Sequence, residues 1–284
     1  MKLNKFFLFG LVMLLASALS AQDLISALDL AKISKNDDVI IICATSEDGY
    51  KVHISGAVNI PHTSLCNNEP IRTVIKPASE MAKILGENGV STDKTIIVYD
   101  EGSGKYAGRM YWILKYLGAP NVKMLDGNIK GWKAKRKPIT GAPAKVTPTT
   151  FTAKADAAQL AKMDEVKKAV GNSSYVIVDA RTPEEYAGTA DSETLKRKGH
   201  VPSAVNVNYE TVMDSKGELK SNEELTSMFE AKGITKDKTA IVYCETSVRA
   251  GVVYLSLKGL GYPNVKVYDG AYLEWQTTEA NKVE

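Results

Sequence analysis

The sequence predicts an α/β protein of two tandem domains, each a parallel sheet flanked by helices. Short runs rich in Val and Ile alternate with amphipathic helical segments, the pattern typical of a parallel sheet covered by helices. The chain also repeats itself, since residues 95–132 (TIIVYDEGSGKYAGRMYWILKYLGAPNVKMLDGNIKGW) match residues 239–275 (TAIVYCETSVRAGVVYLSLKGLGYPNVKVYDGAYLEW). A repeat of this length indicates two copies of one structural unit.

Each copy has the same predicted order: strand, loop, helix, strand, an Asp-Gly pair and a short helix that ends in Trp. The runs at 96–99 and 240–243 are almost continuously apolar, as expected for strands that are buried on both faces. A second pair of matching strands begins upstream, with VIIIC from residue 39 and VIVDARTPEEY from residue 176. We assign the first domain to residues 22–136 and the second to residues 152–284. Residues 137–151 (KPITGAPAKVTPTTF) are rich in Pro, Thr and Ala and predict an extended linker.

The first 21 residues have the three parts of an export signal. Lys2 and Lys5 precede an apolar run over 6–19, and small residues close the segment. The run is short for a membrane span, which needs about 20 apolar residues. We predict a signal peptide over 1–21 and an exported protein, periplasmic or secreted, without stable membrane insertion after its removal. An uncleaved N-terminal anchor is the alternative.

Composition excludes several classes of function. The formal net charge is +3, and basic residues are scattered rather than gathered with aromatics, so no nucleic-acid partner is expected. Cys43, Cys66 and Cys244 are too few for a disulfide scaffold. No spacing of metal-ligating residues is present, so we expect neither a metal nor an organic cofactor. We expect a monomer.

Cys244 stands between a buried strand and a helix, and Asp100 occupies the matching position in the first copy. A cysteine acts as a nucleophile only as its thiolate, and the free N–H groups at a helix start favour an anion. Arg249 adds a positive charge where the helix begins. We therefore predict Cys244 as the nucleophile, partly shielded in a cleft between the domains. Arg249 and the loop residues are predicted to form an anion cradle for substrate, the loop residues being Glu245, Thr246, Ser247 and Val248.

The segments VIVDARTPEEY, GHVPSAVNV, AIVYC and DGAYLEW together resemble the rhodanese family of sulfurtransferases. The tandem form of that family, with an inactive first domain and an active second one, matches both halves of the chain. The resemblance implies two rhodanese-like domains and a persulfide carried on Cys244. The sulfur would come from a small donor anion, thiosulfate or 3-mercaptopyruvate, and would pass to cyanide or a thiol.

Four other residues are candidates for the site. Arg181 is a candidate for substrate binding, although its position at a strand end beside Asp179 favours a structural ion pair between the two. His53 recurs as His200 in the second copy, which indicates a shared structural task, although some mercaptopyruvate-using relatives have a histidine near the site. Arg197 lies in an insertion special to the second copy and could bring a cation over the site.

The loop departs from the family pattern, which leaves alternatives open. Glu245 replaces a basic or glycine residue, and Ser247 replaces a glycine, where a positive φ would strain serine. We favour thiosulfate over 3-mercaptopyruvate because Arg249 supplies charge. A non-catalytic sulfur-carrier module of the cell envelope is the alternative function. A phosphatase-like enzyme is less favoured, because its loop is Cys-x5-Arg and this one is Cys-x4-Arg.

Overall fold

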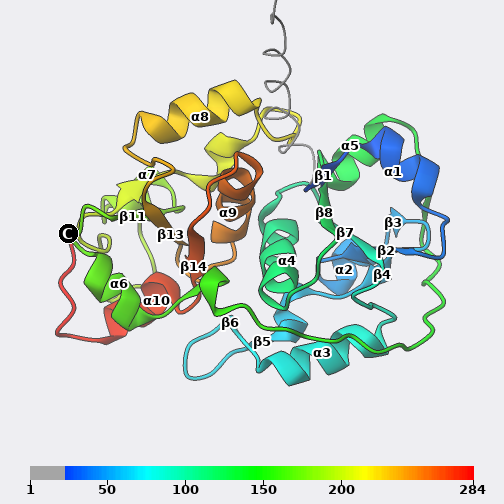
Figure 1. The fold of residues 1–284 in the computed structure, drawn as a ribbon, viewed down its shortest axis with the longest axis horizontal. Helices are drawn as coiled ribbons and strands as arrows, with labels where there is room; N and C mark the ends of the chain where they lie inside the picture. Colours follow the sequence, from blue (N-terminus) through cyan, green and yellow to red (C-terminus); the bar gives the residue numbers. More distant parts are fainter. Residues whose placement is uncertain (1–22) are drawn as a thin grey trace, which may run out of the picture.

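The computed structural model describes residues 23–284, which form two α/β domains lying side by side (Figure 1). Each domain is built on a five-stranded sheet whose strands are all parallel. The predicted fold class is therefore confirmed. The predicted signal peptide, residues 1–21, lies outside the described residues, and export stays a prediction.

The first sheet has the order β1-β8-β7-β2-β4, and helices cover both of its faces (Figure 1). Its strands are β1 (Leu24–Ile25), β2 (Val39–Cys43), β4 (Val58–Asn59), β7 (Thr95–Tyr99) and β8 (Val122–Leu125). The helices of this domain are α1 (Ala27–Ile33), α2 (Glu47–Tyr50), η1 (His62–Leu65), α3 (Ala78–Glu87), α4 (Lys105–Tyr116) and α5 (Asn128–Ala134). Two small antiparallel pairs complete it: β3 (His53–Ile54) with β9 (Ile139–Thr140), and β5 (Cys66–Asn67) with β6 (Val74–Ile75).

The second sheet repeats this order as β10-β14-β13-β11-β12. Its strands are β10 (Leu160–Ala161), β11 (Tyr175–Asp179), β12 (Val205–Asn206), β13 (Thr239–Tyr243) and β14 (Val265–Tyr268). Its helices are η2 (Ala157–Gln159), α6 (Met163–Ala169), α7 (Pro183–Tyr186), η3 (Tyr209–Val212), α8 (Asn222–Glu230), α9 (Ala250–Gly259) and α10 (Ala271–Thr277). Central strands β11 and β13 are fully buried after their first residue, which explains their unbroken apolar sequence.

Helices α4 and α9 pack against each other and join the domains (Figure 1). The two backbones approach each other at Gly108 of α4 and Gly251 of α9, each of which follows an alanine. A Cβ added to Gly251 would lie 2.3 Å from the carbonyl carbon of Gly108, and one added to Gly108 would lie 2.5 Å from the amide nitrogen of Val252. The repeated glycines therefore allow two backbones to touch where the domains meet.

The domains also exchange contacts through their Asp-Gly pairs. In the first domain, Asp126 Oδ1 accepts a hydrogen bond from the amide of Leu219, 2.9 Å away in the second. In the second domain, Asp269 Oδ2 accepts one from the amide of Ile75, also at 2.9 Å, in the β5–β6 hairpin of the first. Buried Arg109 strengthens the second contact, because its Nη2 lies 2.5 Å from Asp269 Oδ1. Each domain thus extends a loop over its neighbour.

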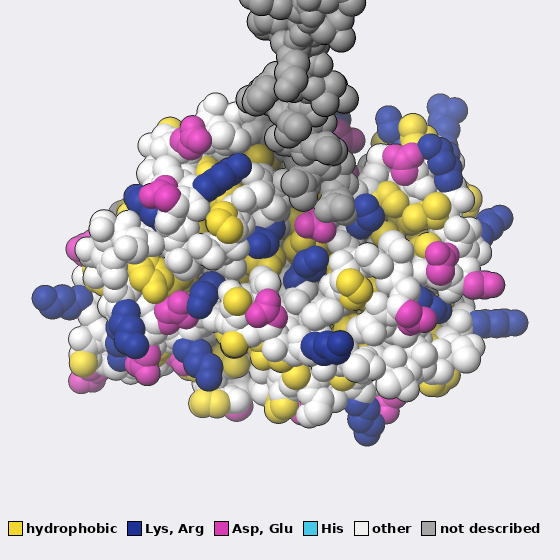
Figure 2. Space-filling view, in the orientation of Figure 1, with side chains coloured by type: hydrophobic (Ala, Val, Ile, Leu, Met, Phe, Trp, Pro, Cys, Tyr) yellow, Lys and Arg dark blue, Asp and Glu magenta, His cyan; other side chains and the backbone are white. Residues whose placement is uncertain are grey.

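The surface carries basic and acidic side chains interspersed with apolar ones on the face shown in Figure 2. None of the helices in residues 23–284 is long and apolar enough to span a membrane.

Candidate functional site

Cys244 directly follows β13, and its side chain is 0% exposed. Helix α10 holds the start of the loop through two backbone hydrogen bonds. The amide of Tyr272 donates to the Cys244 carbonyl and the amide of Leu273 donates to the Glu245 carbonyl, each at 3.0 Å. We predicted only partial shielding of Cys244. The structure shows the residue fully buried.

Ser247 adopts a φ of 58°, the left-handed region that favours glycine. Its side chain is buried, and its Oγ donates a hydrogen bond to the carbonyl oxygen of Tyr268 at the end of β14. This bond ties the middle of the loop to the sheet and offsets part of the cost of the conformation. The loop therefore has the left-handed backbone conformation at this position although the residue is serine and not glycine.

In the first domain, the loop that matches the Cys244 loop surrounds the carboxylate of Asp100. Its carboxylate accepts hydrogen bonds from the amides of Gly102, Gly104, Tyr106 and Ala107, at 2.7, 3.1, 3.1 and 3.3 Å respectively. The Ser103 hydroxyl donates a further bond to it. The first domain thus fills its own anion cradle with a side chain. Cys244 directly follows β13 in the second domain, as Asp100 directly follows β7 in the first.

Replacing Asp100 with alanine removes the acceptor for these buried amides. We expect the free energy of unfolding to fall by about 3 kcal/mol or more, because each unsatisfied buried donor costs roughly 1–3 kcal/mol. Urea unfolding followed by circular dichroism measures the change. Glu101→Ala, which truncates the exposed neighbouring carboxylate, is the control and should change stability little. Equal losses in the two variants would contradict this account of Asp100.

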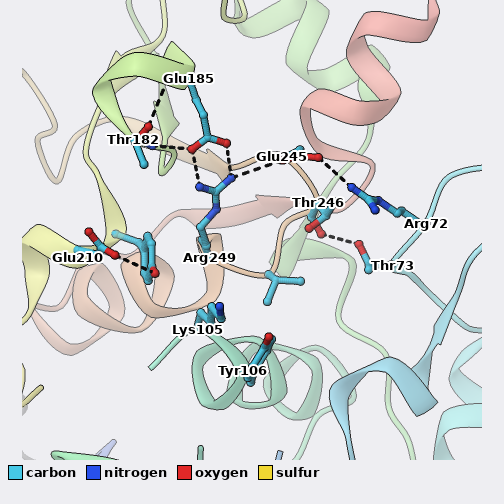
Figure 3. A pocket seen from close by; sticks show the side chains of 12 residues that line it. Arg72, Thr73, Lys105, Tyr106, Thr182, Glu185, Glu210, Glu245, Thr246 and Arg249 are labelled. Carbon is cyan, nitrogen blue, oxygen red and sulfur yellow. Dashed lines mark hydrogen bonds and ion pairs between the residues drawn. The ribbon is translucent and has the colours of Figure 1, made fainter. Parts of the chain in front are cut away.

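A cavity of about 540 Å³ lies over the Cys244 loop, between the domains (Figure 3). The second domain contributes loop residues Glu245, Thr246, Val248 and Arg249, together with Thr182, Glu185, Tyr209 and Glu210. The first domain contributes Arg72, Thr73, Lys105 and Tyr106. The candidate site is therefore shared by both copies, although Cys244 belongs to the second.

Arg249 points into this cavity, and Glu185 neutralises most of its charge (Figure 3). Its two Nη atoms lie 2.5 and 2.7 Å from the Glu185 carboxylate oxygens, and Glu245 is 3.9 Å away. Burial lowers the pKa of Arg249, but the hydrogen bonds to Glu185 and the charge of Cys244 outweigh it and raise that pKa overall. Arg249 is therefore a fixed cation that connects the cavity with the sulfur.

Two contacts from the first domain hold the loop from the other side (Figure 3). Arg72 Nη2 lies 2.9 Å from Glu245 Oε1, which also accepts a hydrogen bond from Thr194 at 2.8 Å. The hydroxyl of Thr73 donates to the Thr246 carbonyl at 2.7 Å. Glu245, the residue that departs from the family pattern, is thus an anchor for the opposite domain.

Arg181 and Asp179 are not brought to the cavity. Arg181 is 0% exposed, its Nη2 lies 2.6 Å from Asp179 Oδ2, and it also donates to the carbonyl of Gly199 at 2.7 Å. The guanidinium packs 4.1 Å from the ring centroid of Tyr272. Arg181 is therefore held by Asp179 and Gly199 and does not line the cavity, while its Nη1 has no hydrogen-bond partner among the described residues.

His53 and Arg197 also have structural positions. His53 is buried, stacks on Tyr50 at 3.7 Å and bonds the Tyr50 carbonyl. His200 repeats this arrangement with Tyr186. Arg197 donates to the carbonyls of Thr278 and Asn281 and so fastens the C-terminal segment. Neither His53 nor Arg197 lines the cavity.

The sequence did not indicate the contributions of Arg72, Lys105, Tyr106 and Glu210. A signal was available for two of them. Lys105 and Tyr106 precede Gly108 as Val248 and Arg249 precede Gly251, so two helices that touch at these glycines bring all four residues together. No sequence pattern indicated that Arg72 reaches across from a hairpin of the other domain.

Comparison with known proteins agrees with this geometry. A sequence profile described as the Rhodanese-like domain matches residues 26–135 and 162–278. A putative thiosulfate sulfurtransferase of Mycolicibacterium smegmatis is 34% identical over 78% of this chain and 82% of its own. The 3-mercaptopyruvate sulfurtransferase of Escherichia coli is 34% identical over 78% of this chain and 80% of its own.

Solved structures show the same fold. A structure of the E. coli 3-mercaptopyruvate sulfotransferase SseA superposes with a TM-score of 0.80 at 32% identity, covering 88% of this chain and 98% of that one. An anaerobic ergothioneine biosynthesis enzyme from Chlorobium limicola superposes with a TM-score of 0.85 at 22% identity, covering 93% of this chain and 70% of that one. The second likeness concerns the fold alone.

Proposed function

Because the chain belongs to the rhodanese family, through a domain match in each half, we propose that it moves sulfane sulfur by way of a persulfide on Cys244. The observation that carries this proposal is the contrast between the two loops. In the first domain the Asp100 carboxylate accepts the hydrogen bonds of its loop, whereas the second domain has the thiol of Cys244 after the equivalent strand. Sulfurtransferase activity itself is supported by the relatives of both names.

Thiosulfate is the donor that we favour. In the first step, the Cys244 thiolate attacks the outer sulfur of thiosulfate, the S–S bond of the donor breaks, and sulfite leaves with the bonding pair. In the second step, cyanide or a thiolate attacks the outer sulfur of the persulfide, and Cys244 leaves as a thiolate. Arg249 lies where it can neutralise the donor and the anionic intermediate.

The test loads the purified protein with thiosulfate or 3-mercaptopyruvate at equal concentration and measures its mass, then adds cyanide and measures thiocyanate. We expect a gain of one sulfur on Cys244, faster from thiosulfate, and release as thiocyanate. No sulfur gain from either donor would refute the proposal. A faster gain from 3-mercaptopyruvate would refute the preference only.

A sulfur-carrier module is the second candidate, favoured by the complete burial of Cys244 and by the Arg72–Glu245 pair over its loop. The same experiment separates the two functions. A carrier would gain sulfur on Cys244 but would release none to cyanide or small thiols.

Glu185→Gln tests the charge assignment. The substitution removes a carboxylate from the cavity and frees the charge of Arg249. We expect the KM for thiosulfate to fall by about fivefold with a smaller change in kcat, the factor for about 1 kcal/mol of charge interaction. Steady-state kinetics measure it, with Glu184→Gln, an exposed neighbour, as the control. A rise in KM would mean that Glu185 acts by positioning Arg249.

A further inference from the structure

The charged groups of the cavity are balanced in number, which is unexpected for a site that binds only anions. Three cations line it, Arg72, Lys105 and Arg249, and so do three carboxylates, Glu185, Glu210 and Glu245. Arg72 pairs with Glu245, while Arg249 pairs with Glu185 and, more distantly, with Glu245. Within residues 23–284, this leaves Lys105 and Glu210 as the cavity charges without an ion-pair partner inside 4.0 Å.

Lys105 is the first residue of α4, in the first domain. Its Nζ lies 4.8 Å from the ring centroid of Tyr106, which also lines the cavity. Among the described residues, no hydrogen bond or ion pair within 4.0 Å is found for the Lys105 ammonium. Lys105 therefore keeps three ammonium donors that a ligand can use.

Glu210 belongs to η3, in the second domain. Its Oε1 accepts a hydrogen bond from the Tyr209 hydroxyl at 3.2 Å, and its side chain is exposed at the edge of the cavity (Figure 3). The remaining lone pairs of the carboxylate are available to a cationic group. The cavity thus has one unpaired charge of each sign, on opposite domains.

We propose that the acceptor half of the reaction is selective for zwitterionic thiols, an amino-acid or short-peptide thiol with both a carboxylate and an ammonium group. Lys105 binds the carboxylate and Glu210 binds the ammonium group, so that the thiol is held over the Cys244 loop. The assignment rests on the proposed function, since it concerns how the persulfide is discharged.

The transfer is a displacement at sulfur. The acceptor thiolate attacks the outer sulfur of the Cys244 persulfide, a new S–S bond forms on the acceptor, and the old S–S bond breaks with its electron pair on Cys244 Sγ. The product is the acceptor persulfide, and no oxidant is needed. Lys105 and Glu210 take no part in bond making and are positioning residues that set specificity.

The test uses full-length mature protein loaded on Cys244 with thiosulfate and freed of excess donor. Four acceptors then discharge it in single-turnover reactions followed by mass spectrometry: L-cysteine, cysteamine, 3-mercaptopropionate and 2-mercaptoethanol. These thiols carry both charges, the ammonium only, the carboxylate only and neither. Each rate constant is divided by the thiolate fraction at the assay pH. We expect cysteine to react about tenfold faster than 2-mercaptoethanol.

Two variants test which charged group of the thiol each residue binds. Lys105→Met should slow cysteine and 3-mercaptopropionate by about tenfold and leave cysteamine unchanged, while Glu210→Gln should slow cysteine and cysteamine and leave 3-mercaptopropionate unchanged. Lys35→Met and Glu230→Gln, exposed and outside the cavity, are matched controls that should match the unsubstituted protein. A mass gain of one sulfur on Cys244, measured before any acceptor is added, shows that each variant is loaded.

Equal corrected rates for the four thiols, or variants that slow all four alike, would overturn the assignment while leaving the proposed function in place. Failure to load sulfur on Cys244 would instead overturn the proposed function, and the assignment with it.

Discussion

Cys244→Ser is expected to reduce sulfur uptake and thiocyanate formation to background. A serine hydroxyl in this loop is a poor nucleophile without a general base, and it cannot hold a sulfane sulfur. The fold should survive, because the first copy keeps the same strand and helix with Asp100 at the equivalent position. The loss would therefore be chemical rather than structural.

The measurement is mass spectrometry after thiosulfate treatment, with a thermal melt of each variant to verify folding. Cys66→Ala is the matched control, since Cys66 is also a buried free thiol but belongs to the first domain. Burial raises the pKa of Cys66, which opposes thiolate formation there. Uptake of sulfur by Cys244→Ser, or its loss in a folded Cys66→Ala variant, would contradict the assignment of the nucleophile.

Gly251→Ala should be the most destabilising single methyl addition that we predict. The new Cβ would lie 2.3 and 2.4 Å from the carbonyl carbon and oxygen of Gly108, which are backbone atoms that no rotamer change can move. We expect a loss of about 3 kcal/mol and a fall in melting temperature of roughly 6–12 °C. Since the cavity lies between the domains, sulfur transfer should fall as well.

Gly259→Ala is the control within the same helix. It closes α9, and a Cβ there meets no atom within 4 Å. Alanine should therefore stabilise the protein by about 0.5–1 kcal/mol, the usual gain over glycine in a helix. Differential scanning calorimetry of both variants makes the comparison. A Gly251→Ala protein as stable as Gly259→Ala would show that the domains separate without cost.

The fold could be predicted because its signals are local and occur twice. Buried strands such as β7 and β13 are predicted by unbroken apolar runs, and their repetition indicates two copies of one structural unit. The position of Cys244 between strand and helix follows from the same pattern. Ser247 could be identified as an unusual residue, but its bond to Tyr268 depends on a neighbouring strand.

The remainder of the site could not be predicted because it depends on contacts between distant segments. Arg72 and Glu245 are 173 positions apart, and they meet because a hairpin crosses between the domains. The surroundings of Arg181 have a similar cause. Its guanidinium lies 4.1 Å from the ring centroid of Tyr272, a residue far away in the sequence.

The carboxylate of Asp100 has a consequence for the active domain. In the first domain the cradle ligand is part of the polypeptide, so its amides are satisfied as soon as the chain folds. In the second, under the function proposed above, the matching ligand arrives and departs as sulfur is carried. A group that binds the native state alone adds to its stability by mass action. The proposed function therefore predicts that turnover and thermodynamic stability are linked in this protein, with the donor anion stabilising the native state while it is bound.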